Sequence, residues 1–341
     1  MSHRIALNFE DGVTRFVTAH AGESIADAAF RQGVNVPLDC RDGACGTCKA
    51  RRQSGAYDPG DYIEDALSDD EAAQGYLLCC QATAQSDMVV DIPASSAACK
   101  AAPVETAAVV TAVERLSPNR IRLAVRARDG ALPAFLPGQY VNVRAPGTRA
   151  VRSYSFASAS GAETASFLIR YVPGGAMSSW LTQAAKPGDA LVLRGPLGGF
   201  YLREVRRPVL LIAGGAGVAP ILSMLETLAR DGARGQPVRL LYGVRHEADL
   251  VGAERIAALA EQIPDFGWTT CCSAPDTAHP RTGYVGDHLD PAALNGGEAD
   301  VYLCGPPAMV EAVRKQVMAL GLPPERLHFE KFTPATEALA A

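Results

Sequence analysis

The chain has 341 residues, of which 48% are apolar and 20% are charged, and its formal net charge at pH 7 is −5. This length predicts two or three domains, and the composition is that of an ordinary globular protein. The negative charge argues against a nucleic-acid-binding protein and against charge-driven attachment to an anionic membrane. The most apolar stretch, residues 208–225, is interrupted by three glycines and Pro220, and no apolar run follows a basic start. We therefore expect neither a secretion signal nor a membrane span.

The first hundred residues predict a small β-rich domain. Alternating apolar residues over 4–17, with a turn at Asp11-Gly12, predict a β-hairpin, and the pattern over 24–32 predicts a helix. Further strands are expected over 49–52 and 88–92. The stretch that follows, 93–103, has small residues and no periodicity, which is typical of a linker.

Three cysteines of this domain, Cys40, Cys45 and Cys48, are spaced C-x4-C-x2-C, and a fourth cysteine follows at a distance. This is the spacing of a plant-type 2Fe-2S ferredoxin, in which a tight loop and a distant segment together supply four thiolates. Gly43 and Gly46 permit positive φ and let backbone N–H groups face the sulfurs. A zinc site is the alternative, although zinc sites favour paired C-x2-C knuckles.

The fourth ligand is either Cys79 or Cys80, which are adjacent. Neighbouring residues of an extended segment point in opposite directions, so only one of the two thiols can face the cluster. The nine cysteines are an odd number in a chain without a secretion signal. They indicate cluster ligands and buried thiols in a reducing compartment, and we expect the cytoplasm.

The middle of the chain carries many short β runs, which predict an antiparallel barrel. Examples lie at 121–127, 140–144, 152–158 and 166–172. On one of these strands Arg152 and Tyr154 share a face, so a cation for a phosphate lies beside a ring that can pack on a flat heterocycle. Ser155 points the other way in an ideal strand.

A second motif of the barrel region has a strand that ends in Gly174 and Gly175, followed by a helix that contains Met177 and Ser178. Free N–H groups at such a helix start bind phosphate. A plain glycine turn explains the same residues equally well.

From residue 208 onward, apolar strands alternate with helices that begin near Pro220, Ala253 and Pro307. This alternation predicts a parallel sheet with helices on both faces. Gly215 and Gly217 lie in a glycine loop between the first strand and its helix, where a dinucleotide pyrophosphate can approach the backbone. A second glycine site, Cys304-Gly305, ends another strand at the edge where such folds bind ligands.

These motifs, in this order, resemble those of ferredoxin-NAD(P)H reductase-like enzymes with an N-terminal 2Fe-2S domain, and the resemblance covers nearly the whole chain. Residues 62–67 and 93–96 are similar to those of the reductase components of benzoate, toluate, anthranilate and halobenzoate 1,2-dioxygenase systems. The resemblance implies a multidomain fold with an α+β ferredoxin-like (β-grasp) domain, an antiparallel β-barrel FAD domain and an α/β parallel-sheet NAD domain. We place these at residues 1–97, 105–205 and 206–341, with a linker at 98–104.

The resemblance also implies roles for single residues. The glutamine after Cys80 favours that residue as the fourth ligand. Arg152 would contact an FAD phosphate, Tyr154 would pack on the isoalloxazine and Ser155 would lie near flavin N5. The FAD pyrophosphate would be bound by Gly174, Gly175, Met177 and Ser178. The nicotinamide dinucleotide would be held by Gly215, Gly217 and Pro220, with Cys304 and Gly305 beside the nicotinamide. Glu330 and Phe332 match the family's terminal segment, which reaches the flavin, but here nine residues follow Phe332. The expected catalytic residues are Ser155, Cys304 and Glu330.

The choice of coenzyme depends on the segment that contains Arg245, Glu247 and Asp249. An acidic residue accepts hydrogen bonds from a free ribose 2′-OH and repels a 2′-phosphate, so Glu247 and Asp249 favour NADH. Arg245 can still pair with a phosphate. The alternative is that these are solvated loop charges.

The predicted function is electron transfer from NADH, which gives two electrons at once to FAD, onward to a cluster that accepts one at a time. Cysteine ligation predicts a cluster potential of about −400 mV, low enough to reduce a Rieske centre at roughly −150 mV or higher. The resemblance implies a Rieske-type terminal oxygenase for an aromatic acid as the partner. A reductase of a di-iron monooxygenase or a deoxysugar dehydratase is the alternative, and a zinc or disulfide scaffold without a redox role is a third hypothesis.

Overall fold

The computed structural model describes residues 2–38, 40–100, 104–144, 146–148 and 150–332. The chain divides into two compact units, which are described separately: Met1–Pro103 with Leu197–Gly199, and Val104–Pro196 with Phe200–Ala341. Across the described ranges, no helix combines the length and the apolar character needed to cross a membrane. The nine residues after Phe332 lie outside the description.

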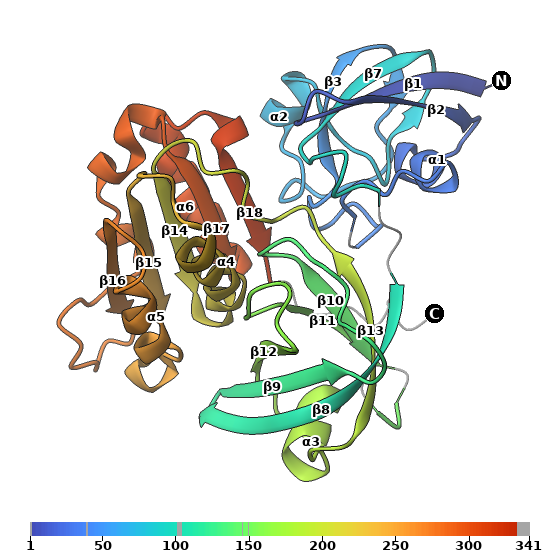
Figure 1. Ribbon diagram of the computed structural model, residues 1–341. Coiled ribbons are helices and arrows are strands. Elements are labelled where there is room, and N and C mark those ends of the chain that lie inside the picture. The colour runs from blue at the N-terminus through green and yellow to red at the C-terminus, as the bar shows by residue number, and fades with distance from the viewer. Residues whose placement is uncertain (1, 39, 101–103, 145, 149, 333–341) are drawn as a thin grey trace. The chain divides into compact units, whose positions relative to one another are not determined.

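The first unit has a five-stranded mixed sheet in the order β2-β1-β7-β3-β5 (Figure 1). Its strands are β1 (Ser2–Phe9), β2 (Thr14–His20), β3 (Lys49–Ser54), β5 (Tyr76–Leu78) and β7 (Met88–Ile92). A second, small sheet pairs β4 (Tyr57–Asp58) with β6 (Thr83–Ala84), and the helices are α1 (Ile25–Arg31) and α2 (Asp69–Ala73). The first strand pairs antiparallel with β2 and parallel with β7, so the two ends of the domain are joined in one sheet. The predicted hairpin, helix and β-grasp fold are confirmed.

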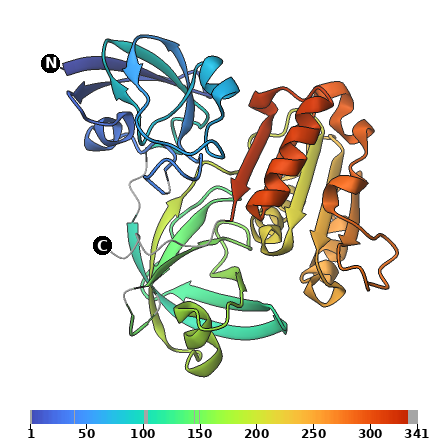
Figure 2. The same cartoon turned by 180° about the vertical axis from the view of Figure 1, so that it is seen from behind.

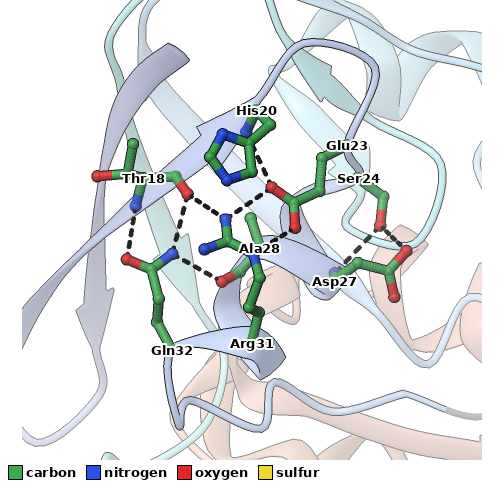
Figure 3. Close-up of polar contacts among 8 residues, drawn as sticks. All are labelled: Thr18, His20, Glu23, Ser24, Asp27, Ala28, Arg31 and Gln32. Atoms are coloured by element: carbon green, nitrogen blue, oxygen red, sulfur yellow. Dashed lines mark hydrogen bonds and ion pairs between the residues drawn. The ribbon is translucent and has the colours of Figure 1, made fainter.

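Helix α1 begins and ends where its sequence predicts. Ser24 caps its start by accepting a hydrogen bond from the Asp27 N–H at 3.1 Å. At the other end Gln32 exchanges two hydrogen bonds with the backbone of Thr18 on β2, at 3.0 and 2.9 Å (Figure 3). Arg31 pairs with Glu23 at 2.8 Å and lowers the pKa of that carboxyl to about 2. The C-terminal end of the helix is therefore held to β2 through Gln32.

The small-residue stretch after β7 packs on the first unit. Ser96 donates from its N–H and its hydroxyl to Asp11, at 2.9 and 2.8 Å. The carbonyl of Cys99 accepts from the Asn35 N–H at 2.8 Å, and the Cys99 side chain is buried. Cys99 and Lys100 thus belong to this unit although the sequence places them in the linker, of which residues 101–103 lie outside the described ranges. The domain boundaries themselves stay predictions.

The second unit begins with a six-stranded sheet in the order β11-β10-β13-β8-β9-β12. Its strands are β8 (Val104–Ser117), β9 (Arg120–Ala127), β10 (Tyr140–Arg144), β11 (Val151–Ser155), β12 (Thr164–Arg170) and β13 (Ala190–Leu197), and helix α3 (Ala176–Gln183) follows β12. An antiparallel bridge between Phe156 and Phe167 joins the two edge strands. This closure makes the sheet the predicted barrel.

The rest of the second unit is an all-parallel sheet in the order β16-β15-β14-β17-β18. Its strands are β14 (Val209–Gly214), β15 (Val238–Val244), β16 (Phe266–Cys272), β17 (Asp300–Gly305) and β18 (Leu327–Lys331). The helices are α4 (Val218–Asp231), α5 (Ala253–Ala260) and α6 (Pro307–Ala319), and short 3-10 turns include η1 (Gly215–Gly217), η2 (Glu247–Asp249), η3 (Val285–His288), η4 (Pro291–Gly297) and η5 (Pro324–Arg326).

Both faces of this sheet are covered by helices, as predicted. Alternate residues of β14 point to opposite faces, so Leu211 packs in the core with α4 and α5 whereas Leu210 packs in the core with α6. Figures 1 and 2 show α4 and α5 on one face and α6 on the other. Apolar residues on both faces explain why the strands are continuous hydrophobic runs.

The barrel closure generates a stability prediction. Phe156 is fully buried between Phe135, with ring centroids 3.6 Å apart, and Phe167, at 5.3 Å. Phe156→Ala should destabilise the barrel by about 3–5 kcal/mol, because it leaves a cavity where the edge strands meet. Urea unfolding followed by circular dichroism measures the change. Phe16→Ala removes the same side chain from a site that is 56% exposed and should cost about 0.5 kcal/mol or less. Equal losses in the two variants would contradict the role of Phe156 in closure.

Candidate functional site

The cysteine loop of the first unit lies between α1 and β3 and turns through three residues with positive φ. Arg41 has φ 65°, Gly43 has φ 77° and Gly46 has φ 75°. A Cβ added at Gly43 would collide with the backbone carbonyl of Asp61, and one at Gly46 would lie 3.1 Å from the Ala66 carbonyl oxygen. Glycine is therefore required at both positions for two reasons: the positive φ and the close packing of the backbone.

The thiols form two pairs. The N–H of Cys45 donates to Cys40 Sγ at 3.3 Å, and Cys40 lowers the pKa of the Cys45 thiol to about 7. Cys48 Sγ donates to Cys80 Sγ at 3.2 Å and lowers the pKa of the Cys80 thiol. Each pair thus contains one thiol that ionises readily, and the thiolate is the form that binds metal.

The two adjacent cysteines have different environments. Cys79 is 1% exposed, its backbone bonds Cys48 and Ala26, and burial raises the pKa of its thiol. Cys80 is only partly buried and lies at Cys48. The side-chain amide of Gln81 donates to the Arg41 carbonyl at 2.9 Å and to Cys80 Sγ at 3.8 Å. The structure therefore brings Cys80, and not Cys79, to the thiols of the loop.

This donor set fits a 2Fe-2S cluster. Two irons with four cysteine ligands need thiolates in pairs, and the thiols are paired. Backbone N–H groups face the sulfurs: Thr47 donates to Cys45 Sγ at 3.5 Å, and the Gly43 N–H lowers the pKa of Cys80. Among the residues with described positions, no group of three or more His, Cys, Asp or Glu side chains is arranged so that it could hold a single metal ion.

The barrel places its predicted residues on both faces of β11. Arg152 and Tyr154 share one face, and burial raises the pKa of the Tyr154 hydroxyl. Ser155 is buried and points the opposite way, where its hydroxyl donates to Glu330 Oε2 on β18 at 3.3 Å. Ser155 thus lies on the face of β11 opposite to Arg152 and Tyr154, as predicted, and this face is directed toward the parallel sheet.

Helix α3 starts at the predicted glycines, but two of the predicted side chains are already engaged. Gly174 has φ 72°, and Gly175 is the N-cap residue. The Met177 side chain packs in the barrel core, and Ser178 Oγ accepts from the Val172 N–H at 2.9 Å. Gly175 makes no side-chain cap, so this helix start offers backbone N–H groups to a phosphate.

The two glycine motifs of the parallel sheet, which the sequence presents as separate sites, pack against each other. A Cβ at Gly217 would collide with the Cys304 carbonyl, and one at Gly305 would lie 3.2 Å from Gly214. Gly215 has φ 55°, and Pro220 is buried in the first turn of α4. The carboxyl ends of β14 and β17 thus pack closely through their glycines, and the Met309 side chain lies against Gly214 and Gly305.

Cys304 and Glu330 are register partners on β17 and β18, at the same edge of the sheet. Burial raises the pKa of the Cys304 thiol, and the Glu330 carboxylate raises it further. The thiol is therefore neutral at physiological pH. Phe332, the last described residue, donates its N–H to the Gly305 carbonyl at 2.9 Å. The structure brings the three expected catalytic residues, Ser155, Cys304 and Glu330, into one place.

The two acidic residues expected at the coenzyme ribose lie in the same 3-10 turn, η2, in opposite environments. Glu247 is exposed. Asp249 is 5% exposed, and both of its carboxylate oxygens accept hydrogen bonds from the β8–β9 turn, from Ser117 and Asn119. The sequence analysis missed these two residues and Arg120, because a short Ser-Pro-Asn-Arg turn carries no signal of a partner far along the chain.

Models of three protein families match consecutive parts of the chain. A 2Fe-2S iron-sulfur cluster binding domain matches residues 8–85, an oxidoreductase FAD-binding domain matches residues 107–201 and an oxidoreductase NAD-binding domain matches residues 211–315. The expectation of three cofactors, a 2Fe-2S cluster, FAD and NAD, is confirmed.

Similar proteins match over nearly the full length. The toluate 1,2-dioxygenase electron transfer component of Pseudomonas putida is 52% identical, over 97% of this chain and 99% of its own. The 2-halobenzoate 1,2-dioxygenase electron transfer component of Burkholderia cepacia is 46% identical, over 98% and 99%. Among solved structures, a cytochrome P450 reductase of Amycolatopsis is 35% identical, with a TM-score of 0.70 over 97% of this chain and 100% of its own.

These matches confirm the resemblance inferred from the motifs. An FAD-binding barrel, an NAD-binding parallel sheet and a 2Fe-2S domain make the chain an oxidoreductase. It belongs to the family of flavin and iron–sulfur reductases that includes the toluate and 2-halobenzoate 1,2-dioxygenase electron transfer components.

Proposed function

We propose that this chain takes electrons from NADH and passes them, through FAD and the 2Fe-2S cluster, to a Rieske-type terminal oxygenase that dihydroxylates an aromatic acid. The observation that carries this proposal is the 52% identity, over 97% of the chain, to the toluate 1,2-dioxygenase electron transfer component. Docking to the oxygenase is transient, because one reductase must reload between successive single-electron deliveries.

The bound groups supply the redox chemistry: FAD accepts two electrons together and releases them singly, and the cluster carries one. The chain supplies binding and charge. Arg152 is the cation for an FAD phosphate, Tyr154 packs on the isoalloxazine ring, and the start of α3 directs backbone N–H groups at the pyrophosphate. Because Met177 and Ser178 use their side chains within the protein, their contribution is through the backbone.

At the nicotinamide the chain supplies a neutral thiol and a directed hydroxyl. Gly215, Gly217 and Gly305 carry no side chains at this edge of the sheet, where the dinucleotide would bind with Cys304 near the nicotinamide. Glu330 accepts the Ser155 hydroxyl proton in a hydrogen bond and fixes the orientation of Ser155 Oγ. Ser155 then presents its oxygen toward the flavin, while the buried Cys304 places no charge beside the reacting atoms.

The cluster residues act as an outlet. Cys40, Cys45, Cys48 and Cys80 would hold the cluster, and N–H groups from Gly43, Cys45 and Thr47 would stabilise the charge on the sulfurs. All nine cysteines are free thiols, which fits the reducing cytoplasm as the site of action.

A second candidate function is supply of electrons to a monooxygenase, which the match to a cytochrome P450 reductase favours. Product formation with purified candidate oxygenases, NADH and this protein separates the two. If an aromatic cis-diol forms only with a ring-hydroxylating dioxygenase, the dioxygenase function is supported. If turnover occurs only with a monooxygenase, the monooxygenase function replaces it.

Anaerobic titration with NADH tests the electron pathway directly. We expect flavin bleaching in the visible spectrum and a reduced-cluster signal in electron paramagnetic resonance, both at lower concentration with NADH than with NADPH. A purified protein that is colourless, without flavin or iron–sulfur absorbance, would sink the proposal.

Replacement of the adjacent cysteines tests the ligand set. Cys80→Ser should remove the cluster absorbance and electron transfer to one-electron protein acceptors, yet leave flavin reduction by NADH intact. Cys79→Ala should retain the cluster, because its thiol lies in the core away from the loop. The reverse pattern would assign the fourth ligand to Cys79.

Replacement of Ser155 tests the step at the nicotinamide. Ser155→Ala removes the hydroxyl bonded to Glu330 and should slow flavin reduction by about a hundredfold, measured by anaerobic stopped flow. Ser155→Thr, which keeps a hydroxyl, should recover much of the rate. Ser153→Ala, at an exposed position of the same strand, is the matched control, and a similar loss there would show that strand β11 has merely been disturbed.

A further inference from the structure

Besides the Ser155–Glu330 hydrogen bond, the barrel and the parallel sheet contact each other at helix α4 and at the turn that follows β15. The first is the side of helix α4, where Ser223 Oγ donates to the Ser158 carbonyl at 2.7 Å and Glu226 accepts from the Ala159 N–H at 2.6 Å. Ala157 and Leu168 of the barrel share a core with this helix. This contact holds α4 against the barrel.

The second contact is made by Asp249. Ser117 Oγ donates to Asp249 Oδ1 at 2.9 Å, and Asn119 Nδ2 donates to Oδ2 at 3.2 Å. Tyr242 of β15 fixes the backbone of the same residue by donating to its carbonyl at 3.2 Å. Asp249 is thus a buried carboxylate from the sheet whose two oxygens are both held by the barrel.

The same barrel turn reaches the glycine loop. Arg120, 8% exposed, donates to the Asn119 carbonyl at 2.9 Å, and its Nη2 lies 2.8 Å from where a Cβ of Gly215 would stand. Burial lowers the pKa of the Arg120 guanidinium, and the nearby Asp249 charge opposes that shift. The turn therefore contacts η2 through Asp249 and η1 through Arg120, so one short segment sets the position of both coenzyme-facing turns.

These contacts separate the roles of the two acidic residues. Asp249 is 5% exposed and both of its oxygens accept hydrogen bonds from the barrel, so turning its carboxylate outward to a ribose hydroxyl would leave the buried Ser117 hydroxyl without its acceptor, which is costly. Glu247, two residues earlier, is exposed and free of that constraint. The environment of each residue is set by the 3-10 turn, which points one side chain inward and the other outward.

We propose that Asp249 is a positioning residue, which fixes the carboxyl edge of the parallel sheet against the β8–β9 turn, and that Glu247 alone of the pair recognises the coenzyme ribose. This inference rests on the proposed function in taking NADH as the electron donor. Hydride transfer requires reacting atoms about 3–3.5 Å apart, so a small displacement of η1 relative to the barrel has a large effect on rate.

The test compares Asp249→Ala, Ser117→Ala, their combination and Glu247→Ser, with Glu261→Ala at the exposed C-cap of α5 as the control. Anaerobic stopped flow gives the limiting rate of flavin reduction and the ratio of NADH to NADPH efficiency, and absorbance gives FAD and cluster content. Asp249→Ala should lower the limiting rate by about tenfold or more, with the coenzyme ratio and cofactor content unchanged. Glu247→Ser should lower the coenzyme ratio by about tenfold and keep the limiting rate.

Ser117 provides a test from the barrel side, because it cannot be a ribose ligand while it is bonded to Asp249. Ser117→Ala should lower the limiting rate in the same direction, and the double variant should be no slower than Asp249→Ala, since both remove one contact. If Asp249→Ala does not fold, Asp249→Asn and Ser117→Ala give the same comparison. The inference is overturned if Asp249→Ala changes the coenzyme ratio at an unchanged limiting rate, or if the two single effects multiply.

The outcome is separable from that of the proposed function. If the wild type is reduced by neither coenzyme, the proposed function fails. The thermal unfolding midpoints of the wild type, Asp249→Ala, Ser117→Ala and the double variant then decide whether Ser117 and Asp249 are coupled. If the losses in midpoint simply add, Ser117 and Asp249 are not coupled and the contact is disproved. If the double variant has the same midpoint as Asp249→Ala, the contact is supported.

Discussion

The arrangement of the second unit depends on polar contacts that cross from the barrel to the parallel sheet. Ser155 lies on β11 of the barrel and Glu330 lies on β18 of the parallel sheet. Their hydrogen bond puts a barrel hydroxyl at the sheet edge where β17 ends. The barrel matches an FAD-binding domain and the sheet matches an NAD-binding domain, so a reaction between the two cofactors requires the barrel and the sheet to be held in a fixed relation.

Burial then decides which groups at that edge carry charge. The Cys304 thiol has no exposed surface and lies beside the Glu330 carboxylate, and both effects raise its pKa, so it stays protonated. Among the four cluster cysteines the two members of each pair differ: partner thiols and N–H donors lower the pKa values of Cys45 and Cys80, whereas hydrogen bonds to those partners and burial raise the pKa values of Cys40 and Cys48. The same side chain is thus a neutral contact at one site and a ready metal ligand at the other.

Local patterns predicted most of the fold. Strands β7 and β10 and the starts of α5 and α6 lie where periodicity and turn residues place them, because those signals act over a few residues. The stretch after β7 was harder to interpret, since small residues without periodicity suit a linker equally well as a segment that packs on Asp11 and Asn35. Its contacts depend on residues more than sixty positions earlier, which no local pattern reports.

The site shows the same limit more sharply. Sequence motifs identified the chemical types that a reductase needs, and the structure gathers Ser155, Cys304 and Glu330 as expected. Motifs do not report accessibility. Glu247 and Asp249 are equivalent as letters, yet the partners that bury Asp249 are 132 and 130 residues away in the chain. A carboxylate next to a coenzyme loop can bind a ribose only if its oxygens are not already held by buried partners. The hydrogen-bond partners of the carboxylate, and not its charge, therefore determine its role.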